Sequence, residues 1–328
     1  STPSHLQIAG SVRARPEAFG IPTFEIASND IHELEPVAAQ AVAQVRSGRG
    51  PVAVVCHTFR LCSHSKSDDG RPPEVIEPWL EKDPLRLAQA HLEPHQWQQL
   101  CDSVDGELRQ VEELALAQPQ ATHWNLPGLA WPKVGPRLVI EDRLRVGQAL
   151  NQGFHRLLAE RPEVVVVGMD ILDPYGGAFK VEKGLSTRFP GQVLPTPVCE
   201  MSLTGACAGM ALRGLRPVLQ IMFGDFLTLA VEPLVNYASK YRGMYNDQVR
   251  CPLVVRAAMG GGRGYGPTHS QSLEKLLLGI PDLRVVALSV AHDPQALLFE
   301  CVEDDSPVLL VENKLVYSRP LLDLSDQQ

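Results

Sequence analysis

The stretch EVVVVGMD (163–170) decides the fold, because a run of valines without polar alternation is typical of a strand buried on both faces. Similar apolar runs follow it: RPVLQIMF (216–223), CPLVVRAA (251–258), LRVVALS (283–289) and SPVLLVEN (306–313). Segments of helical spacing separate and flank these runs, as in RVGQALNQGFHRLLAERP (145–162), whose apolar residues share one stripe. This alternation predicts an α/β fold with a doubly wound parallel sheet flanked by helices.

The first part of the chain predicts a second α/β unit. IPTFEI (21–26) and GPVAVVCHTFRL (50–61) read as strands, and between them Asn29 or Asp30 caps a helix that reaches about Ser47. Helices are expected from about Asp83 to Ala117. A Pro- and Gly-rich stretch then reads as a linker, so the predicted division is a domain of residues 1–118, a linker of 119–141 and a domain of 142–328.

Composition narrows the class of protein. With 30 basic and 38 acidic residues, the net charge of -8 argues against nucleic-acid binding. No apolar run is long enough to cross a membrane, and no signal-peptide pattern opens the sequence. Seven scattered cysteines without a CxxC pair suggest neither a disulfide framework nor a zinc cluster, and they predict a cytoplasmic protein with reduced thiols.

Ligands of doubly wound sheets bind at the carboxyl ends of the strands. The candidate segments GGGRGYG and CSHSKSDD each follow a predicted strand. GGGRGYG (260–266) follows a strand but matches neither phosphate-loop pattern, so a phosphate loop and a close approach of backbone both stay open. His269 follows that loop and directly precedes an expected helix capped by Ser270, as a structural or a functional residue. The loop CSHSKSDD (62–69) is either a solvated series of turns or a mobile active-site loop that carries His64.

In PTPVCE (195–200), Glu200 lies between a strand around Val193 and a helical run from about Ser202. It is either a carboxylate favoured by the helix dipole or a desolvated carboxylate that shares a proton with a ligand nitrogen. Cys199 has no neighbouring cation in the sequence to lower its pKa, so a nucleophilic thiol is the less favoured choice.

Together these segments resemble the thiamine-diphosphate-dependent decarboxylating component of 2-oxo acid dehydrogenase complexes, of the pyruvate, branched-chain and acetoin types. Residues 142–320 resemble the pyrimidine-binding domain of its beta subunit, through TPVCE (196–200), GMALRGLRPVLQIMFGDF (209–226), PTHSQSLE (267–274) and PVLLVENKLVY (307–317). Residues 1–118 resemble the C-terminal half of its alpha subunit, through AFGIP (18–22), GPVAVVCHTFRLCSHSKSDD (50–69) and EKDPLRL (81–87). The resemblance implies a thiamine-diphosphate-binding fold of the transketolase-like superfamily in a fused alpha/beta form.

The resemblance also implies roles for individual residues. Glu200 matches the glutamate that hydrogen-bonds N1′ of the cofactor's aminopyrimidine, and Phe226 matches the aromatic residue that stacks on that ring. Val198 and Met222 match apolar neighbours of the ring. His64 and His269 match two active-site histidines, implied in proton transfer and in the reductive acylation of a lipoyl group.

The implied activity is oxidative decarboxylation of a 2-oxo acid, with transfer of the acyl group to a lipoyl-bearing acyltransferase or another acyl carrier. Its cofactors are thiamine diphosphate and Mg²⁺. The family holds the metal through a GDG…NN motif that is absent here, so no residue of this sequence is assigned as a metal ligand and the ligands are expected upstream. The family places its cofactor at a subunit interface, which implies a homo-oligomer or a complementing chain.

A non-catalytic scaffold or interaction module of the same fold is the alternative. Three expectations motivate this alternative: the metal motif is absent, the C-terminal domain of the beta subunit is expected to be missing, and several residues depart from the family pattern. These departures are Met169 and Gln220 for glutamates, Ser63 for glycine, and prolines at 16 and 233. The sequence leaves the identity of the 2-oxo acid and of the acyl acceptor open.

Overall fold

The structure is a computed structural model that describes residues 9–62, 71–119 and 144–321. The chain divides into two compact units, Ser1–Thr122 and His123–Gln328. This division falls inside the segment predicted as a linker, and the domain boundaries themselves stay a prediction. Within the described ranges, no helix combines the length and the apolar character that a membrane span requires.

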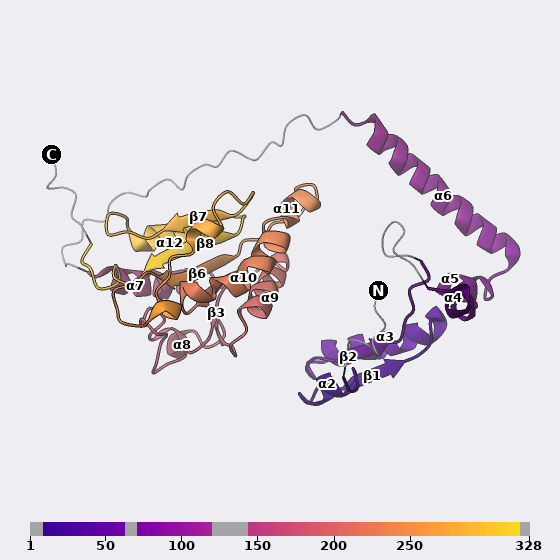
Figure 1. Cartoon of the computed structure of the whole chain (residues 1–328), viewed down its shortest axis with the longest axis horizontal. Helices are drawn as coiled ribbons and strands as arrows, with labels where there is room; N and C mark the ends of the chain where they lie inside the picture. Colours follow the sequence, from indigo (N-terminus) through magenta and orange to yellow (C-terminus); the bar gives the residue numbers. More distant parts are fainter. Residues whose placement is uncertain (1–8, 63–70, 120–143, 322–328) are drawn as a thin grey trace. The chain divides into compact units, whose positions relative to one another are not determined.

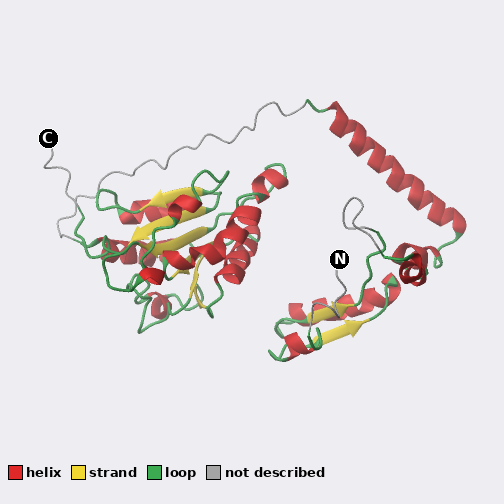
Figure 2. Ribbon diagram, in the orientation of Figure 1, coloured by secondary structure: helices red, strands yellow, loops and turns green. Residues whose placement is uncertain are grey.

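The second unit contains the predicted parallel sheet (Figures 1 and 2). Its six strands pair in the order β4-β3-β5-β6-β8-β7, and every pairing is parallel. The strands are β3 (Val164–Gly168), β4 (Val193–Pro195), β5 (Arg216–Ile221), β6 (Val254–Met259), β7 (Arg284–Ala287) and β8 (Val308–Asn313). The expectation of an α/β fold with a parallel sheet flanked by helices is confirmed.

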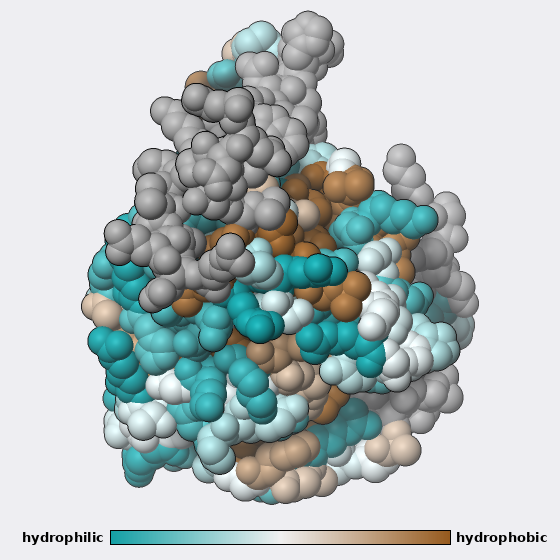
Figure 3. All heavy atoms as spheres, turned by 90° about the vertical axis from the view of Figure 1, so that its left-hand side faces the viewer, coloured by the Kyte–Doolittle hydropathy of each residue, from teal (hydrophilic) through white to brown (hydrophobic). Residues whose placement is uncertain are grey.

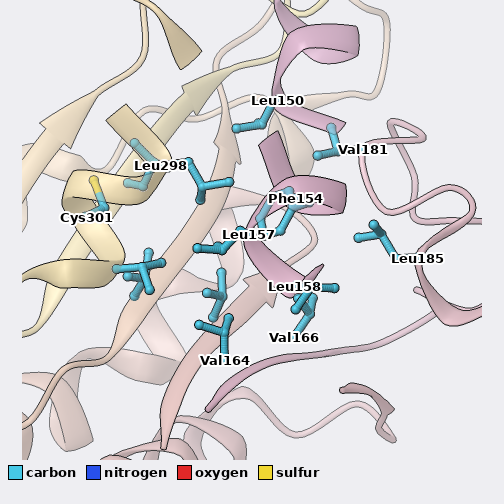
Figure 4. Close-up of a cluster of buried hydrophobic side chains, with 14 of the residues drawn as sticks. Leu150, Phe154, Leu157, Leu158, Val164, Val166, Val181, Leu185, Leu298 and Cys301 are labelled. Carbon is cyan, nitrogen blue, oxygen red and sulfur yellow. The ribbon is translucent and has the colours of Figure 1, made fainter. Parts of the chain in front are cut away.

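The valine run of β3 shows why this sheet is buried on both faces. Since successive side chains of a strand point to opposite faces, Val164 and Val166 join one hydrophobic cluster while Val165 and Val167 join another. Helices α7 (Val146–Glu160) and α12 (Pro294–Glu303) supply the first cluster, part of which Figure 4 shows. Helices α9 (Glu200–Leu212) and α10 (Leu227–Glu232) supply the second.

The segment after β5 forms several short helical pieces. They are a 3-10 turn (Gly224–Phe226), α10, a π-helix (Pro233–Ala238) and α11 (Tyr241–Met244). Pro233 lacks the N–H that would continue the α-helical ladder, so α10 ends before it.

The prediction of a helix after His269 is wrong. Only the 3-10 turns Pro267–His269 and Glu274–Leu276 form there. Gln271, between the two turns, uses its backbone elsewhere: its N–H lies 3.3 Å from Oδ1 of Asp225, and its carbonyl accepts from the N–H of Gly260 at 3.1 Å. Contacts with distant strand ends have replaced helical hydrogen bonds.

The first unit is a small strand–helix–strand arrangement. Strands β1 (Thr23–Ile26) and β2 (Ala53–Cys56) pair in parallel across α3 (Ile31–Arg46), with Asp30 rather than Asn29 as the helix cap. The remaining helices are α2 (Ala14–Glu17), α4 (Pro73–Leu80), α5 (Pro84–Gln89), α6 (Pro94–Ala117) and, in the second unit, α8 (Leu185–Arg188). Ala41 is the one buried hydrophobic side chain among the described residues of the first unit.

Figure 3 shows one face of the molecule, on which hydrophilic residues surround smaller apolar areas.

Candidate functional site

The carboxyl ends of β4, β5 and β6 carry most of the residues predicted for the site. Val198 and Glu200 follow β4, Met222 and Phe226 follow β5, and His269 follows β6. Because all strands of this sheet are parallel, these segments lie at the same edge. His64 lies outside the described residues.

Glu200 is the first residue of α9, directly after the N-cap Cys199. Its side chain is 9% exposed, and no group of the described residues hydrogen-bonds to its carboxylate. Helix α9 packs against β5 and α10. Glu200 therefore occupies the helix-end position foreseen for it, and the residue is largely buried. Its unpartnered carboxylate could accept a hydrogen bond from a donor on a ligand.

An open cleft of about 420 Å³ lies at the carboxyl ends of β3 and β4, close in sequence to Glu200. Its lining consists of Asp170, Leu172, Tyr175, Pro195 and Thr196. Oγ1 of Thr196 is shielded from solvent and has no hydrogen-bond partner among the described residues. The hydroxyl of Thr196 is therefore an unpartnered polar group buried beside this cleft.

Gln220, which stands where the resembled family has glutamate, packs against β3. A Cβ on Gly168 would meet the Cβ of Gln220 at 2.9 Å, so only glycine fits opposite it without a shift. Oε1 of Gln220 is shielded and has no partner within the described ranges. Position 220 therefore has a neutral amide near the middle of the sheet.

An aromatic cluster gathers around Phe223, directly after β5. The ring of His269 lies 4.7 Å from that of Phe223 and 5.2 Å from that of Phe226, in edge-to-face geometry. Phe223 also contacts Tyr265 and Phe179, at 5.6 and 5.9 Å. Such packing fixes the orientation of the His269 imidazole and of the Phe226 ring.

Polar groups hold the segment that carries His269. Nζ of the buried Lys314 donates to the carbonyl of His269, and Nε2 of Gln271 donates to Oδ1 of Asp225 at 2.8 Å. Burial lowers the pKa of Lys314, the nearby Arg263 lowers it further, and the Asp225 carboxylate opposes both. Oδ2 of Asp225 is shielded and unpartnered among the described residues. Together these groups form a clamp on residues 269–271.

The predicted residues thus fall into two groups. Phe226 and His269 lie together in the aromatic cluster, with Met222 half-buried one residue before Phe223. The 67% exposed Val198 lies on the loop after β4, and Glu200 begins α9 directly after that loop. Within the described residues no hydrogen bond or ring contact joins either of them to that cluster.

Cys199 differs from expectation. Its pKa is lowered without any cation, chiefly because Oγ of Ser202, 3.0 Å from Sγ, and the backbone N–H of Ser202 stabilise the thiolate. Burial and the Glu200 charge act in the opposite direction. The sequence-based prediction considers only cations as a cause of a lowered pKa, so it misses the hydrogen bonds that the thiol receives at the helix cap.

The sequence also missed Asp225, Lys314 and Phe223. A signal existed for two of them, because Asp225 is a charge inside the apolar FGDF segment and Lys314 directly follows β8 at the ligand-binding edge.

Comparison with known families gives two matches. Residues 142–319 match the family described as transketolase, pyrimidine binding domain, and residues 1–112 match the family described as dehydrogenase E1 component.

Curated relatives align with about half of the chain. One is the acetoin:2,6-dichlorophenolindophenol oxidoreductase subunit beta of Cupriavidus necator, 33% identical over 184 residues, covering 53% of this chain and 54% of the relative. Another is the pyruvate dehydrogenase E1 component subunit beta of Rickettsia bellii, 35% identical over 176 residues, with 53% and 54% covered. A third is the 2-oxoisovalerate dehydrogenase subunit beta of Pseudomonas aeruginosa, 36% identical over 174 residues, with 53% and 49% covered. The chain therefore spans about half the length of these relatives.

Proposed function

Because this chain belongs to the family of the transketolase pyrimidine-binding domain, we propose that it serves in the thiamine-diphosphate-dependent oxidative decarboxylation of a 2-oxo acid. The acyl group would pass to a lipoyl-bearing acyltransferase or another acyl carrier. The match of residues 1–112 to a dehydrogenase E1 component supports this choice of reaction over other reactions of the superfamily. The relatives are subunits beta of acetoin-, pyruvate- and 2-oxoisovalerate-oxidising enzymes, so pyruvate and branched-chain oxo acids are the substrates to test first.

The observation that carries the proposal is the unpartnered carboxylate of Glu200, a largely buried residue at the ligand-binding edge of the sheet. It suits a ring-nitrogen donor such as that of an aminopyrimidine, and the Phe226 ring of the same edge suits stacking on a flat heterocycle. When bound, thiamine diphosphate supplies the carbanion-stabilising centre that a 2-oxo acid needs for loss of carbon dioxide. Glu200 would hold and orient the pyrimidine through its ring nitrogen.

His269 is the residue we assign to proton transfer. Its Nδ1 lies 3.0 Å from Oγ1 of Thr268, which leaves Nε2 for a substrate or an acceptor. The backbone hydrogen bond from Lys314 and the rings of Phe223 and Phe226 hold the imidazole in place. A histidine oriented in this way can act as a general acid or base toward a bound molecule. We keep His64 as a second candidate for this step.

Mg²⁺ is part of the proposal, but the described residues do not fit it. Among them, one cluster has at least three side chains able to hold a metal ion, and two of the three are histidines. Mg²⁺ prefers oxygen ligands in octahedral geometry, so no described group is assigned to it. We further propose an oligomer, since the named relatives are subunits. Seven scattered cysteines without a CxxC pair support our proposal of a cytoplasmic location.

Activity assays test the reaction. Carbon dioxide release from pyruvate, 2-oxoisovalerate and other 2-oxo acids is measured with thiamine diphosphate and Mg²⁺, using ferricyanide or a dye as electron acceptor. The proposal predicts turnover of at least one acid by the wild type, and a fall of about 100-fold in kcat with His269→Ala, the scale of one acid–base group. Cofactor binding without turnover of any acid would contradict the dehydrogenase assignment and favour the non-catalytic module.

A further inference from the structure

The first unit contains a cluster of metal-binding side chains that the proposed function does not use. Asp30, His32 and His91 each offer one ligand atom, and these three atoms lie within 4.8 Å of one another. Asp30 is half-buried, while the two histidines are exposed and open to an ion from solvent.

The fold brings these residues together from two distant segments. Asp30 is the N-cap of α3 and His32 lies in its first turn, whereas His91 follows the end of α5. A second contact holds the same junction, because Nδ2 of Asn29 donates to the carbonyl of Lys82 at 3.2 Å. The cluster is therefore formed by two segments, the start of α3 and the chain after α5, and not by a single loop.

The two oxygens of Asp30 have different partners. Oδ1 accepts the helix-capping hydrogen bond from the N–H of His32 at 2.9 Å, while Oδ2 lies 3.0 Å from Nε2 of His91. The rings of His32 and His91 meet edge to face with their centres 4.3 Å apart. The capping oxygen can thus stay in place while Oδ2 and the two imidazoles turn toward a common point.

These separations suit a small divalent cation. Bonds of about 2.0–2.2 Å from Zn²⁺ to nitrogen and oxygen place neighbouring ligand atoms roughly 3 to 3.6 Å apart. The pair Oδ2 of Asp30 and Nε2 of His91 already has such a spacing. A cation would replace the proton that this pair shares, and His32 would close the set by a side-chain rotation.

We propose that Asp30, His32 and His91 form a site for a first-row divalent transition-metal ion such as Zn²⁺. Two imidazoles and one carboxylate suit Zn²⁺, Ni²⁺ or Cu²⁺, whereas Mg²⁺ and Ca²⁺ prefer sites made of oxygens. The ion would join the start of α3 to the chain after α5, and a fourth position would remain for water. The site differs from the Mg²⁺ site of the proposed function in its ligands and in its preferred metal.

Calorimetric titration of Zn²⁺ into the full chain, freed of metal by a chelator, tests the proposal. We expect Zn²⁺ to bind with the same affinity in the presence of an excess of Mg²⁺. The affinity should fall about tenfold or more in His91→Gln, because loss of a metal ligand costs at least as much as loss of a residue that hydrogen-bonds to a ligand. Asp30→Asn should also weaken binding while keeping the helix cap, because asparagine caps as well as aspartate. His95→Gln, at an exposed position four residues after His91, is the matched control and should bind as the wild type does.

Thermal unfolding gives a second measurement. Zn²⁺ should raise the melting temperature of the wild type and of His95→Gln, and not that of His91→Gln, since only a folded site binds the ion. Zn²⁺ bound equally by all variants, as thiols would bind it, would overturn the proposal. So would an absence of Zn²⁺ binding to the wild type, or displacement by Mg²⁺.

Discussion

Arg256 is buried among charged groups at the centre of the second unit. Its guanidinium donates to Glu312 at 2.5 and 2.8 Å and to Glu182 at 2.6 Å, and it stacks over the ring of Phe154. Burial raises the pKa of Glu182, and the Arg256 charge opposes that rise. Desolvation offsets much of the attraction in such a network, so its members matter most when one of them is removed.

Arg256→Met should therefore lower the free energy of unfolding by about 3–5 kcal/mol, because it leaves two buried carboxylates without their cation. Urea unfolding followed by circular dichroism measures the change. Arg213→Met, at an exposed position of the same unit, should stay within about 0.5 kcal/mol of the wild type. Equal effects of the two substitutions would show that the network has no special role.

The hydrogen-bonded carboxylate of Asp173 should make the free energy of unfolding depend on pH. This carboxylate accepts from the N–H of Gly184 at 2.7 Å, from both N–H and hydroxyl of Thr187, and from the hydroxyl of Ser186. These bonds, that of Gly184 first, hold its pKa far below the ordinary range. Because the folded pKa is the lower one, the stabilisation is complete above the unfolded value of about 4 and is lost as pH falls through the folded value.

We expect Asp173→Asn to be less stable than the wild type by about 2 kcal/mol at pH 7, the scale of hydrogen bonds to a charged group. This difference should shrink as the pH falls below about 4, where the carboxylate of the unfolded chain takes up a proton. Unfolding measured at a series of pH values tests this. A difference that stays constant down to pH 2 would contradict the role given to the charge.

At the scale of elements, the strands followed from the sequence because their pattern is local. The valines of β3 alternate between two hydrophobic clusters, and any sheet covered on both faces needs such a run. The segment after β6 did not follow, because Gln271 bonds to Asp225 and Gly260, which are distant in sequence or on another strand end. Burial of Glu200 likewise is a property of the packed structure, which sequence spacing alone does not determine.

Gln271→Leu should loosen the clamp on the segment that carries His269. Without the side-chain donor, Asp225 loses its 2.8 Å hydrogen bond and a shielded carboxylate is left with fewer partners. We expect faster amide hydrogen exchange in residues 267–273, which mass spectrometry can follow, while Gln248→Leu at an exposed position leaves it unchanged. Unchanged exchange in the Gln271 variant would mean that Lys314 alone fixes the segment.

At the scale of the whole molecule, the two units differ in how well they bury a core. The second has two hydrophobic clusters, whereas the described part of the first buries one hydrophobic side chain and leaves apolar residues of α6 exposed. Leu100, Val104, Leu108 and Val111 of that helix are each more than half exposed. Apolar surface of this extent is commonly covered by another protein surface.

We therefore expect at least a dimer, alone or with a complementing chain. Light scattering with thiamine diphosphate and Mg²⁺ present should give at least twice the mass of one chain. A monomer with the cofactor bound would contradict this expectation.

The central claim is that the Glu200 carboxylate binds the pyrimidine half of thiamine diphosphate. Calorimetric titration of thiamine diphosphate with Mg²⁺ into the full chain, together with any complementing chain, compares the wild type with Glu200→Gln. Glu232→Gln, the same change at the exposed last residue of α10, is the control. Loss of a charge-assisted hydrogen bond worth about 1.5–3 kcal/mol predicts an affinity at least roughly tenfold lower in Glu200→Gln alone. Equal affinities of Glu200→Gln and the wild type would contradict the claim.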